Sequence, residues 1–130
     1  MIEIIEIWAG WLHFKIHHNH MESHFTVSYL DDFEEIMDYL LGIGEGNEYK
    51  YDYNIESRAI TLDGEGTELK LSLTKREYEG IATLVWWLND EPPVTLVIEF
   101  TKFKQSYIDE MNKNKDKYEL DFLMNYDEEK

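Results

Sequence analysis

The sequence predicts an α+β fold: a twisted antiparallel β-sheet of about six to seven strands with two helices packed on one face. Most of the chain alternates apolar and polar residues with a period of two, and short turn signals interrupt the alternation. Apolar residues recur instead at spacings of three and four near residues 31–42 and near 104–117, which predicts helices there. No repeat or linker divides the 130 residues, so we expect a single domain, 1–130, with a frayed tail at 127–130.

The N-terminal part of the chain predicts three strands. Residues 2–8 are rich in isoleucine and residues 11–18 alternate, with an Ala-Gly pair between them that suits a turn. The leucine, phenylalanine and isoleucine of the second run share one face, which we expect to enter the core. After a polar link over 19–23, a third strand is expected from His24 to about Leu30.

The segment 31–42 predicts the first helix. Asp31 suits the start of a helix, where its carboxylate accepts hydrogen bonds from the first exposed amides, and Asp32 complements the positive end of the helix dipole. Apolar side chains then form one stripe, and Gly42 ends the helix.

Beyond this helix the alternation returns and predicts further strands. One begins at Glu48, where three tyrosines at alternate positions share one face. A tight-turn signal, Asp-Gly-Glu-Gly, separates the next two runs. The remaining expected strands cover residues 59–62, 69–73, 81–88 and 94–103.

The C-terminal part of the chain changes character. Residues 104–117 hold few β-branched side chains, and Tyr107, Ile108 and Met111 suit one helical stripe. Residues 118–126 fit two patterns, a closing strand with alternating apolar residues or a continuing helix with aromatic residues at a spacing of four. The aromatic spacing favours the helix, and the strand remains the alternative.

Acidic residues dominate the charge of the chain. The sequence holds 28 Asp and Glu against 12 Lys and Arg, a net charge of −16. This charge repels nucleic acids and anionic membranes, because binding to both depends on Lys and Arg. A basic protein would instead be attracted from a distance. We therefore expect a basic protein partner, no nucleic acid and no membrane; the alternative is that the charge only keeps the protein soluble.

The acids are unevenly distributed along the chain. Residues 31–56 hold nine of them against a single lysine, Lys50. The tyrosines in this segment are aromatic side chains surrounded by charge, which is typical of interface hot spots. The predicted partner-binding residues are Asp31, Asp32, Glu34, Glu35, Asp38, Glu45, Glu48, Tyr49, Tyr51 and Asp52.

All five histidines fall within twelve positions of the N-terminal part. His18 and His20 would lie on one side of an extended strand, and His24 could approach from across the loop, which makes these three a speculative metal site. No strict metal signature accompanies them, and a polar strand end whose histidines happen to cluster is the preferred interpretation. We therefore predict neither a metal nor another cofactor.

The sequence contains no catalytic motif. The absence of cysteine excludes thiol nucleophiles and disulfides, and no Gly-x-Ser-x-Gly elbow is present. Glu99 lies among apolar residues and would be a candidate acid–base group if it pointed inward, but a solvent-facing position is preferred. We predict that the protein is not an enzyme and has no catalytic residues.

The sequence favours the cytoplasm as the location of the protein. The N-terminus carries acids where a signal peptide needs positive charge. No apolar run approaches the roughly 20 residues that span a bilayer. The lack of cysteine suits a reducing compartment.

One stretch resembles a known group of proteins. Residues 25–36 read Phe-Thr-Val-Ser-Tyr-Leu-Asp-Asp-Phe-Glu-Glu-Ile, a strand followed by an acidic amphipathic helix, and residues 46–51 read Gly-Asn-Glu-Tyr-Lys-Tyr. Together they resemble small acidic bacterial immunity-type proteins associated with polymorphic toxins. The resemblance covers about a third of the chain and implies a cytoplasmic inhibitor that binds a toxin, with no residue role to transfer.

The sequence thus predicts an acidic binding protein, with an immunity protein that occludes the cationic site of a toxin as one case. Two other classes stay open. The first is a structural or regulatory module with an unknown partner. The second is a metal-binding protein or enzyme, which requires the histidines or Glu99 to lie in a pocket.

Overall fold

The computed structural model describes residues 1–28, 33–64, 66–117 and 119. The elements are β1 (Ile2–Trp8), β2 (Trp11–His18), β3 (Met21–Ser28), α1 (Phe33–Leu41), β4 (Ile55–Gly64), β5 (Thr67–Arg76), β6 (Ile81–Leu88), β7 (Val94–Glu99) and α2 (Phe100–Lys113). The predicted α+β class with antiparallel pairing is confirmed. The predicted single sheet is wrong, because the strands form a three-stranded sheet, β1-β2-β3, and a four-stranded sheet, β4-β5-β6-β7.

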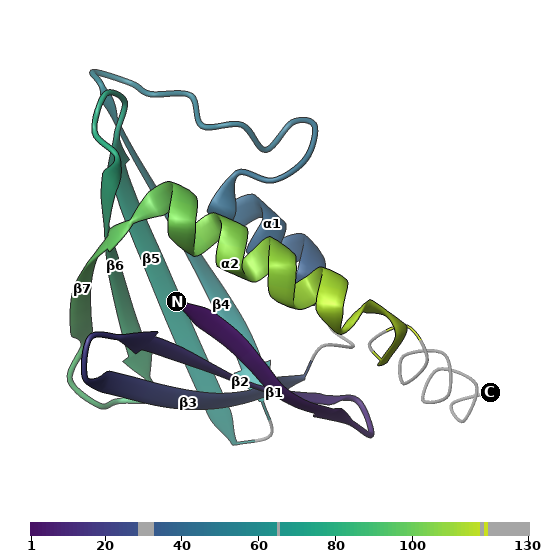
Figure 1. The fold of residues 1–130 in the computed structure, drawn as a ribbon. Coiled ribbons are helices and arrows are strands. Elements are labelled where there is room, and N and C mark those ends of the chain that lie inside the picture. Colours follow the sequence, from purple (N-terminus) through teal and green to yellow (C-terminus); the bar gives the residue numbers. More distant parts are fainter. Residues whose placement is uncertain (29–32, 65, 118, 120–130) are drawn as a thin grey trace.

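The two sheets are separate because the chain between them does not turn back as a hairpin. After β3 the chain passes through α1 and a long loop over 42–54 before β4 begins. In Figure 1 both helices lie over one face of the four-stranded sheet, and the three-stranded sheet crosses its lower end. The sheets come close where a Cβ added to Gly64 would lie 2.7 Å from the carbonyl oxygen of Thr26.

The three-stranded sheet confirms the predicted turn at the Ala-Gly pair, because β1 and β2 pair antiparallel on either side of it. Its register pairs Leu12 with Val27 and Phe14 with Phe25, and these four side chains are buried on one face. The third strand begins at Met21, earlier than predicted, because the link after β2 is a tight turn.

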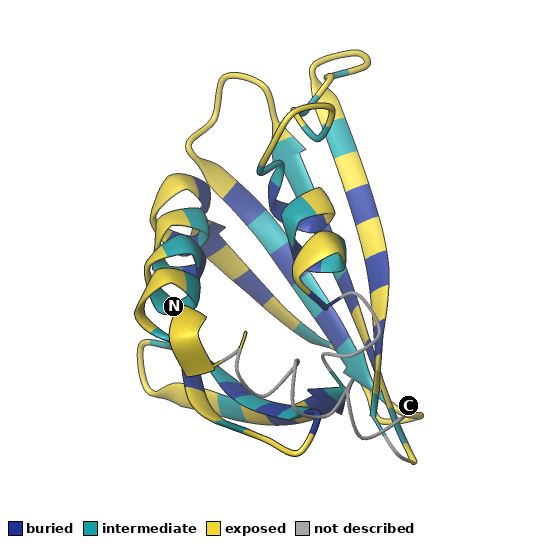
Figure 2. Cartoon of the chain, turned by 90° about the vertical axis from the view of Figure 1, so that its right-hand side faces the viewer, coloured by how far each residue is buried: buried dark blue, intermediate teal, exposed yellow. Residues whose placement is uncertain are grey.

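The four-stranded sheet is a meander in which every neighbouring pair of strands is antiparallel. Burial alternates along each strand, as the stripes of Figure 2 show. One face therefore belongs to the core, while the other faces away from both helices.

Two predicted boundaries are corrected. Helix α2 begins at Phe100, before the predicted 104, so the predicted strand 94–103 ends early. Phe100, Phe103 and Tyr107 are all buried, and their spacing of three and four lets one helical stripe reach the core. Residues 115–117 are again helical. Most of the segment 118–126, for which the sequence left a strand and a helix open, lies outside the described residues, and so does the predicted tail at 127–130.

The predicted tyrosine strand from Glu48 is also wrong. Residues 42–54 form a loop, with only an isolated bridge between Asp52 and Ile55. Tyr53 and Asn54 have positive φ angles of 52° and 67°, which no regular strand accommodates.

Helix α2 protects the outer edge of β1. The backbone N–H of Ile2 donates to Ser106 Oγ at 3.2 Å, and that of Ile4 donates to Glu110 Oε2 at 3.0 Å. Ser106 and Glu110 are four apart and lie on one side of the helix. An edge strand with unpaired amides would invite pairing with another chain, and these side chains satisfy two of those amides.

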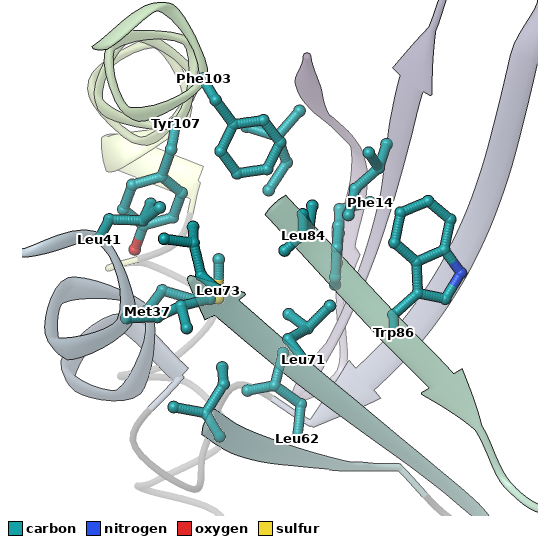
Figure 3. Close-up of a cluster of buried hydrophobic side chains, with 14 of the residues drawn as sticks. Phe14, Met37, Leu41, Leu62, Leu71, Leu73, Leu84, Trp86, Phe103 and Tyr107 are labelled. Carbon is teal, nitrogen blue, oxygen red and sulfur yellow. The ribbon is translucent and has the colours of Figure 1, made fainter. Parts of the chain in front are cut away.

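Residues from both sheets and both helices form one buried cluster. Figure 3 shows Met37 and Leu41 of α1, and Phe103 and Tyr107 of α2, pointing towards the leucines of the four-stranded sheet. Among the described residues, no helix is long and apolar enough to cross a membrane.

Candidate functional site

Helix α1 presents carboxylates to solvent because most of its apolar residues turn to the other side. The buried residues of the helix are Phe33, Met37, Leu40 and Leu41. Glu34 and Glu35 are exposed and Asp38 is half-buried. In the loop that follows, Glu45 and Glu48 are exposed as well. We call these five acidic residues the acidic surface; the predicted Asp31 and Asp32 lie outside the described residues.

Two carboxylates of the acidic surface, Glu34 and Asp38, lie close to each other. Glu34 and Asp38 are four apart on the helix, a spacing that brings like charges together and destabilises them. Burial, and then the charge of Glu34, raises the pKa of Asp38 to about 6. The helix has no basic residue in its last turn to offset these charges. A cation supplied from outside would relieve the repulsion.

A shallow hollow of about 590 Å³ adjoins the acidic surface. It is lined by Glu35, Ile36, Tyr39, Glu45, Asn47 and Ile60. Tyr39 is 44% exposed, so an aromatic ring stands beside two carboxylates. A lysine or arginine side chain suits such a hollow, because its methylene stem contacts apolar groups while its charge approaches carboxylates and the ring.

Arg58 holds the loop of the acidic surface against α1. It lies on β4 and is only 6% exposed. Its Nη1 donates to the backbone oxygens of Tyr39 and Asn47, both at 2.6 Å, and its Nη2 donates to the oxygen of Glu48 at 2.9 Å. Its guanidinium lies 4.0 Å from the ring centre of Tyr49 and 4.9 Å from that of Tyr39. The arginine therefore positions both walls of the hollow.

Glu56 balances the charge of Arg58. Its Oε1 lies 3.3 Å from the arginine Nε. Sequence reasoning missed this pair, although one signal was present. In the alternation Arg58-x-Ile60-x-Leu62, the arginine occupies a core-facing position. A charged residue at such a position needs several partners, and loop carbonyls supply them.

The structure places the predicted tyrosines mainly in the packing of the loop. Tyr49 OH donates to the Leu40 oxygen at 2.5 Å, and its ring meets Phe100 edge-on. Burial raises the pKa of Tyr49 far above its ordinary value. Tyr51 OH accepts a hydrogen bond from Lys75 Nζ at 2.8 Å. Both rings are half-buried, which leaves less of each for a partner than the sequence suggested.

Asp52, the last predicted partner-binding residue, is exposed near the end of the loop. Its backbone forms an isolated β-bridge with Ile55. It does not line the hollow that the other loop residues form.

The speculative metal site is not assembled. His18 pairs with Met21 across the turn. His24 lies three positions beyond Met21 along β3, opposite Lys15, so about 10 Å of strand separates it from the position of His18. The structure instead joins His13 Nε2 and His24 Nδ1 at 2.8 Å. Within the described part of the chain, no group of three or more His, Asp or Glu residues could hold a metal ion.

A second hollow, of about 320 Å³, lies where the end of β2 approaches β7 and the start of α2. Its polar lining includes His17, His18, Glu99 and Lys102, and its walls are mainly apolar. Glu99 is exposed and pairs with Lys102, with 2.7 Å between Oε2 and Nζ. This geometry confirms the solvent-facing position expected for Glu99.

Of the predicted partner-binding residues, the hollow thus brings together Glu35 and Glu45, while Glu34, Asp38 and Glu48 lie on the same helix and loop. Comparisons with models of protein families, with curated proteins and with solved structures found no match.

Proposed function

We propose that this chain is a non-enzymatic binding protein of the cytoplasm, which captures a basic protein partner on the acidic surface of α1 and the loop that follows. The resemblance seen in the sequence suggests one such partner, a cationic toxin domain for which this chain would be the immunity protein. The carboxylates would then occupy the place of the phosphates or other anions that the cationic site normally meets.

The observation that carries this proposal is the hollow between Glu35 and Glu45, with Tyr39 exposed in it. Charge alone would serve solubility. A concave site that combines two carboxylates, an aromatic ring and aliphatic side chains can desolvate and orient a basic side chain. The buried Arg58 keeps the site preformed, so little conformational entropy is lost on binding.

The net charge of −16 acts at longer range. It attracts a cationic partner before contact and increases the association rate, and this effect falls as salt screens the field. The hollow would mainly determine the dissociation rate, because that rate depends on the contacts made in the complex. The two contributions can therefore be separated by kinetics.

Co-expression with a basic protein encoded beside this chain tests the proposal directly. If that neighbour is toxic, co-expression should restore growth, and the two proteins should purify together. A purified pair that forms no complex at low salt would contradict the proposal.

The triple variant E34Q/E35Q/E45Q tests the location of the site. It should weaken the complex by about tenfold or more and raise the dissociation rate. The matched control E77Q/E79Q/E91Q removes the same charge from exposed loop positions elsewhere. If the control weakens binding as much as the first variant, the acids act through net charge alone and the proposed surface is wrong.

A further inference from the structure

Strand β7 has an outer edge that is exposed differently from the other edges of the two sheets. There are four edge strands, β1, β3, β4 and β7. The side chains of Ser106 and Glu110 satisfy two amides of β1, and β3 approaches β4 where Thr26 meets Gly64. Strand β7 ends the four-stranded sheet on its other side, at the left border in Figure 1. An edge of this kind is a template for pairing with another chain.

The pairing of β7 with β6 decides which backbone groups of β7 point outwards. The N–H of Phe100 donates to the Gly80 oxygen at 2.9 Å, which makes these two residues a hydrogen-bonded pair of the antiparallel ladder. Such pairs recur at every second residue, so the N–H and C=O of Leu96 point towards β6. Those of Thr95 and Val97 therefore point away from the sheet, and we call these four groups the open edge. Among the residues that the structure describes, none forms a hydrogen bond with the open edge.

The second hollow lies at one end of the open edge. Its lining includes Val97, Ile98 and Glu99, three consecutive residues of β7. Successive side chains of a strand point to opposite faces of the sheet, so a hollow that touches all three reaches the edge of the strand. Phe103 of α2 adds an apolar wall, and the end of β2 forms the opposite side. With a volume of about 320 Å³, the second hollow can accommodate a large apolar side chain that arrives along β7.

The lining of the second hollow is less acidic than the chain as a whole, which carries −16. Glu99 is the one carboxylate among the lining residues, and Lys102 already pairs with it at 2.7 Å. The other ionisable side chains of the lining are His17 and His18, which donate hydrogen bonds to an anion when they are protonated. A segment that is uncharged or weakly acidic therefore suits this place, whereas a basic segment suits the acidic surface.

We infer that β7 binds an extended segment of another protein, which adds to the four-stranded sheet as a fifth strand and places one apolar side chain in the second hollow. An extended backbone matches the open edge because its own N–H and C=O groups repeat at the same spacing. In strand addition the main-chain hydrogen bonds supply affinity, and pockets for alternate side chains supply specificity. The open edge and the second hollow provide these two parts side by side.

This inference goes beyond the proposed function and does not depend on it. The acidic surface belongs to α1 and the loop that follows, whereas the open edge belongs to β7. The open edge is short, since only Thr95 and Val97 offer outward groups on both their N–H and C=O sides. We therefore expect weak binding, with a dissociation constant of about 100 µM or somewhat tighter for an isolated peptide.

A random nonapeptide library that lacks Lys and Arg tests the inference, because such peptides are not attracted to the acidic surface. Selection on the full chain should enrich peptides with β-branched residues at alternate positions and one large apolar residue at a fixed position. A synthetic peptide of the enriched sequence should bind with a dissociation constant of about 100 µM or tighter in calorimetric titration. If selection yields no such peptide, the inference is wrong.

The variant V97P tests whether the peptide pairs with the open edge. Proline at this position removes an outward N–H and no hydrogen bond to β6, so an edge strand tolerates it. V97P should weaken peptide binding at least tenfold. The matched control V97T keeps the N–H and the branched side chain, and should bind within about threefold of the wild type. Thermal unfolding checks that both variants are folded, and a folded V97P that binds as tightly as the wild type would overturn the inference.

Methylated peptides give a second readout that does not depend on the folding of a variant. The amides of an added strand point alternately towards β7 and away from it. N-methyl groups on one alternate set should therefore abolish binding, while those on the other set leave it nearly unchanged. Equal effects of the two sets would contradict strand addition. Sedimentation velocity should show a monomeric chain at the assay concentration; a dimer that the peptide dissociates would mean that a second copy occupies the open edge, and would also overturn the inference.

Discussion

At the scale of single residues, Arg58 connects the core to the acidic surface. Its guanidinium has two backbone oxygens at 2.6 Å and a third at 2.9 Å, and it lies between the rings of Tyr39 and Tyr49. A lysine carries the same charge but cannot reach several carbonyls from one planar group. R58K should therefore lower the free energy of unfolding by about 2–4 kcal/mol, as measured by urea denaturation.

The control for R58K is R76K on the same sheet, where the arginine is exposed. This substitution should change stability by less than about 0.5 kcal/mol. If both variants lose the same stability, the contacts of Arg58 do not hold the loop in the way the distances indicate. Amide exchange in residues 42–54 should accelerate in R58K alone.

Asp38 makes stability depend on pH. Its pKa in the folded chain is about 6, above the 3.8 of a free aspartate, so the folded state binds the proton more tightly than the unfolded state. The folded state is therefore destabilised as pH rises through 6, and the effect vanishes below about 4. D38N removes the charge and should stabilise the protein at pH 7.5 by about 1 kcal/mol, a value reduced for solvent screening.

The measurement for D38N is the free energy of unfolding at several pH values. The difference from the wild type should shrink steadily between pH 7 and pH 4. E35Q, which removes an exposed carboxylate from the same helix, is the control for the loss of net charge. If the stability difference between D38N and the wild type stays constant down to pH 4, the ionisation of this carboxyl group is not its cause.

At the scale of elements, Glu110 links helix α2 to strand β1. Its carboxylate accepts the N–H of Ile4 at 3.0 Å, at a position where no neighbouring strand can do so. E110A leaves this amide without its acceptor and should cost about 1–2 kcal/mol. E110Q retains a side-chain oxygen and should cost less. Hydrogen exchange of the Ile4 amide should be faster in E110A than in E110Q, and equal rates in the two variants would contradict this contact.

Periodicity predicted those elements whose burial follows a single pattern. The alternation of β2, β5 and β7 and the stripe of α1 were readable from the sequence, whereas β6 has no alternating sequence and still alternates in burial. The tyrosines of the loop alternate in the same way, but Tyr49 is held by Arg58 and by the Leu40 oxygen, and both are tertiary contacts. Similarly, Phe100 continues the alternation of β7 and also begins the stripe of α2. Local pattern could not decide between these two roles.

The candidate site was predictable only in part, for a related reason. The acidic residues of α1 and of the loop could be identified as candidates because they cluster in one segment of the sequence. Their meeting around Tyr39 depends on Arg58, which is nineteen positions away from that residue. Likewise, His13 and His24 meet through the register of β2 and β3 and not through their spacing in the sequence.

At the scale of the whole molecule, the two sheets share one core without joining into a single sheet. They come close at Gly64, where an added Cβ would lie 2.7 Å from the Thr26 oxygen and 3.6 Å from the Trp11 ring. A backbone oxygen cannot give way as a flexible side chain can. G64A should therefore push β3 away from β4 and lower the free energy of unfolding by about 1–3 kcal/mol.

The control for G64A is G80A, because Gly80 has nothing within 4 Å of an added Cβ. That substitution should be neutral or slightly stabilising, since it restricts the unfolded chain. The unfolding of G64A should remain a single transition, because β3 and β4 contribute to the same buried cluster. Two separate transitions in G64A would mean that the sheets can unfold independently, and the contact at Gly64 would then couple two units instead of lying within one core.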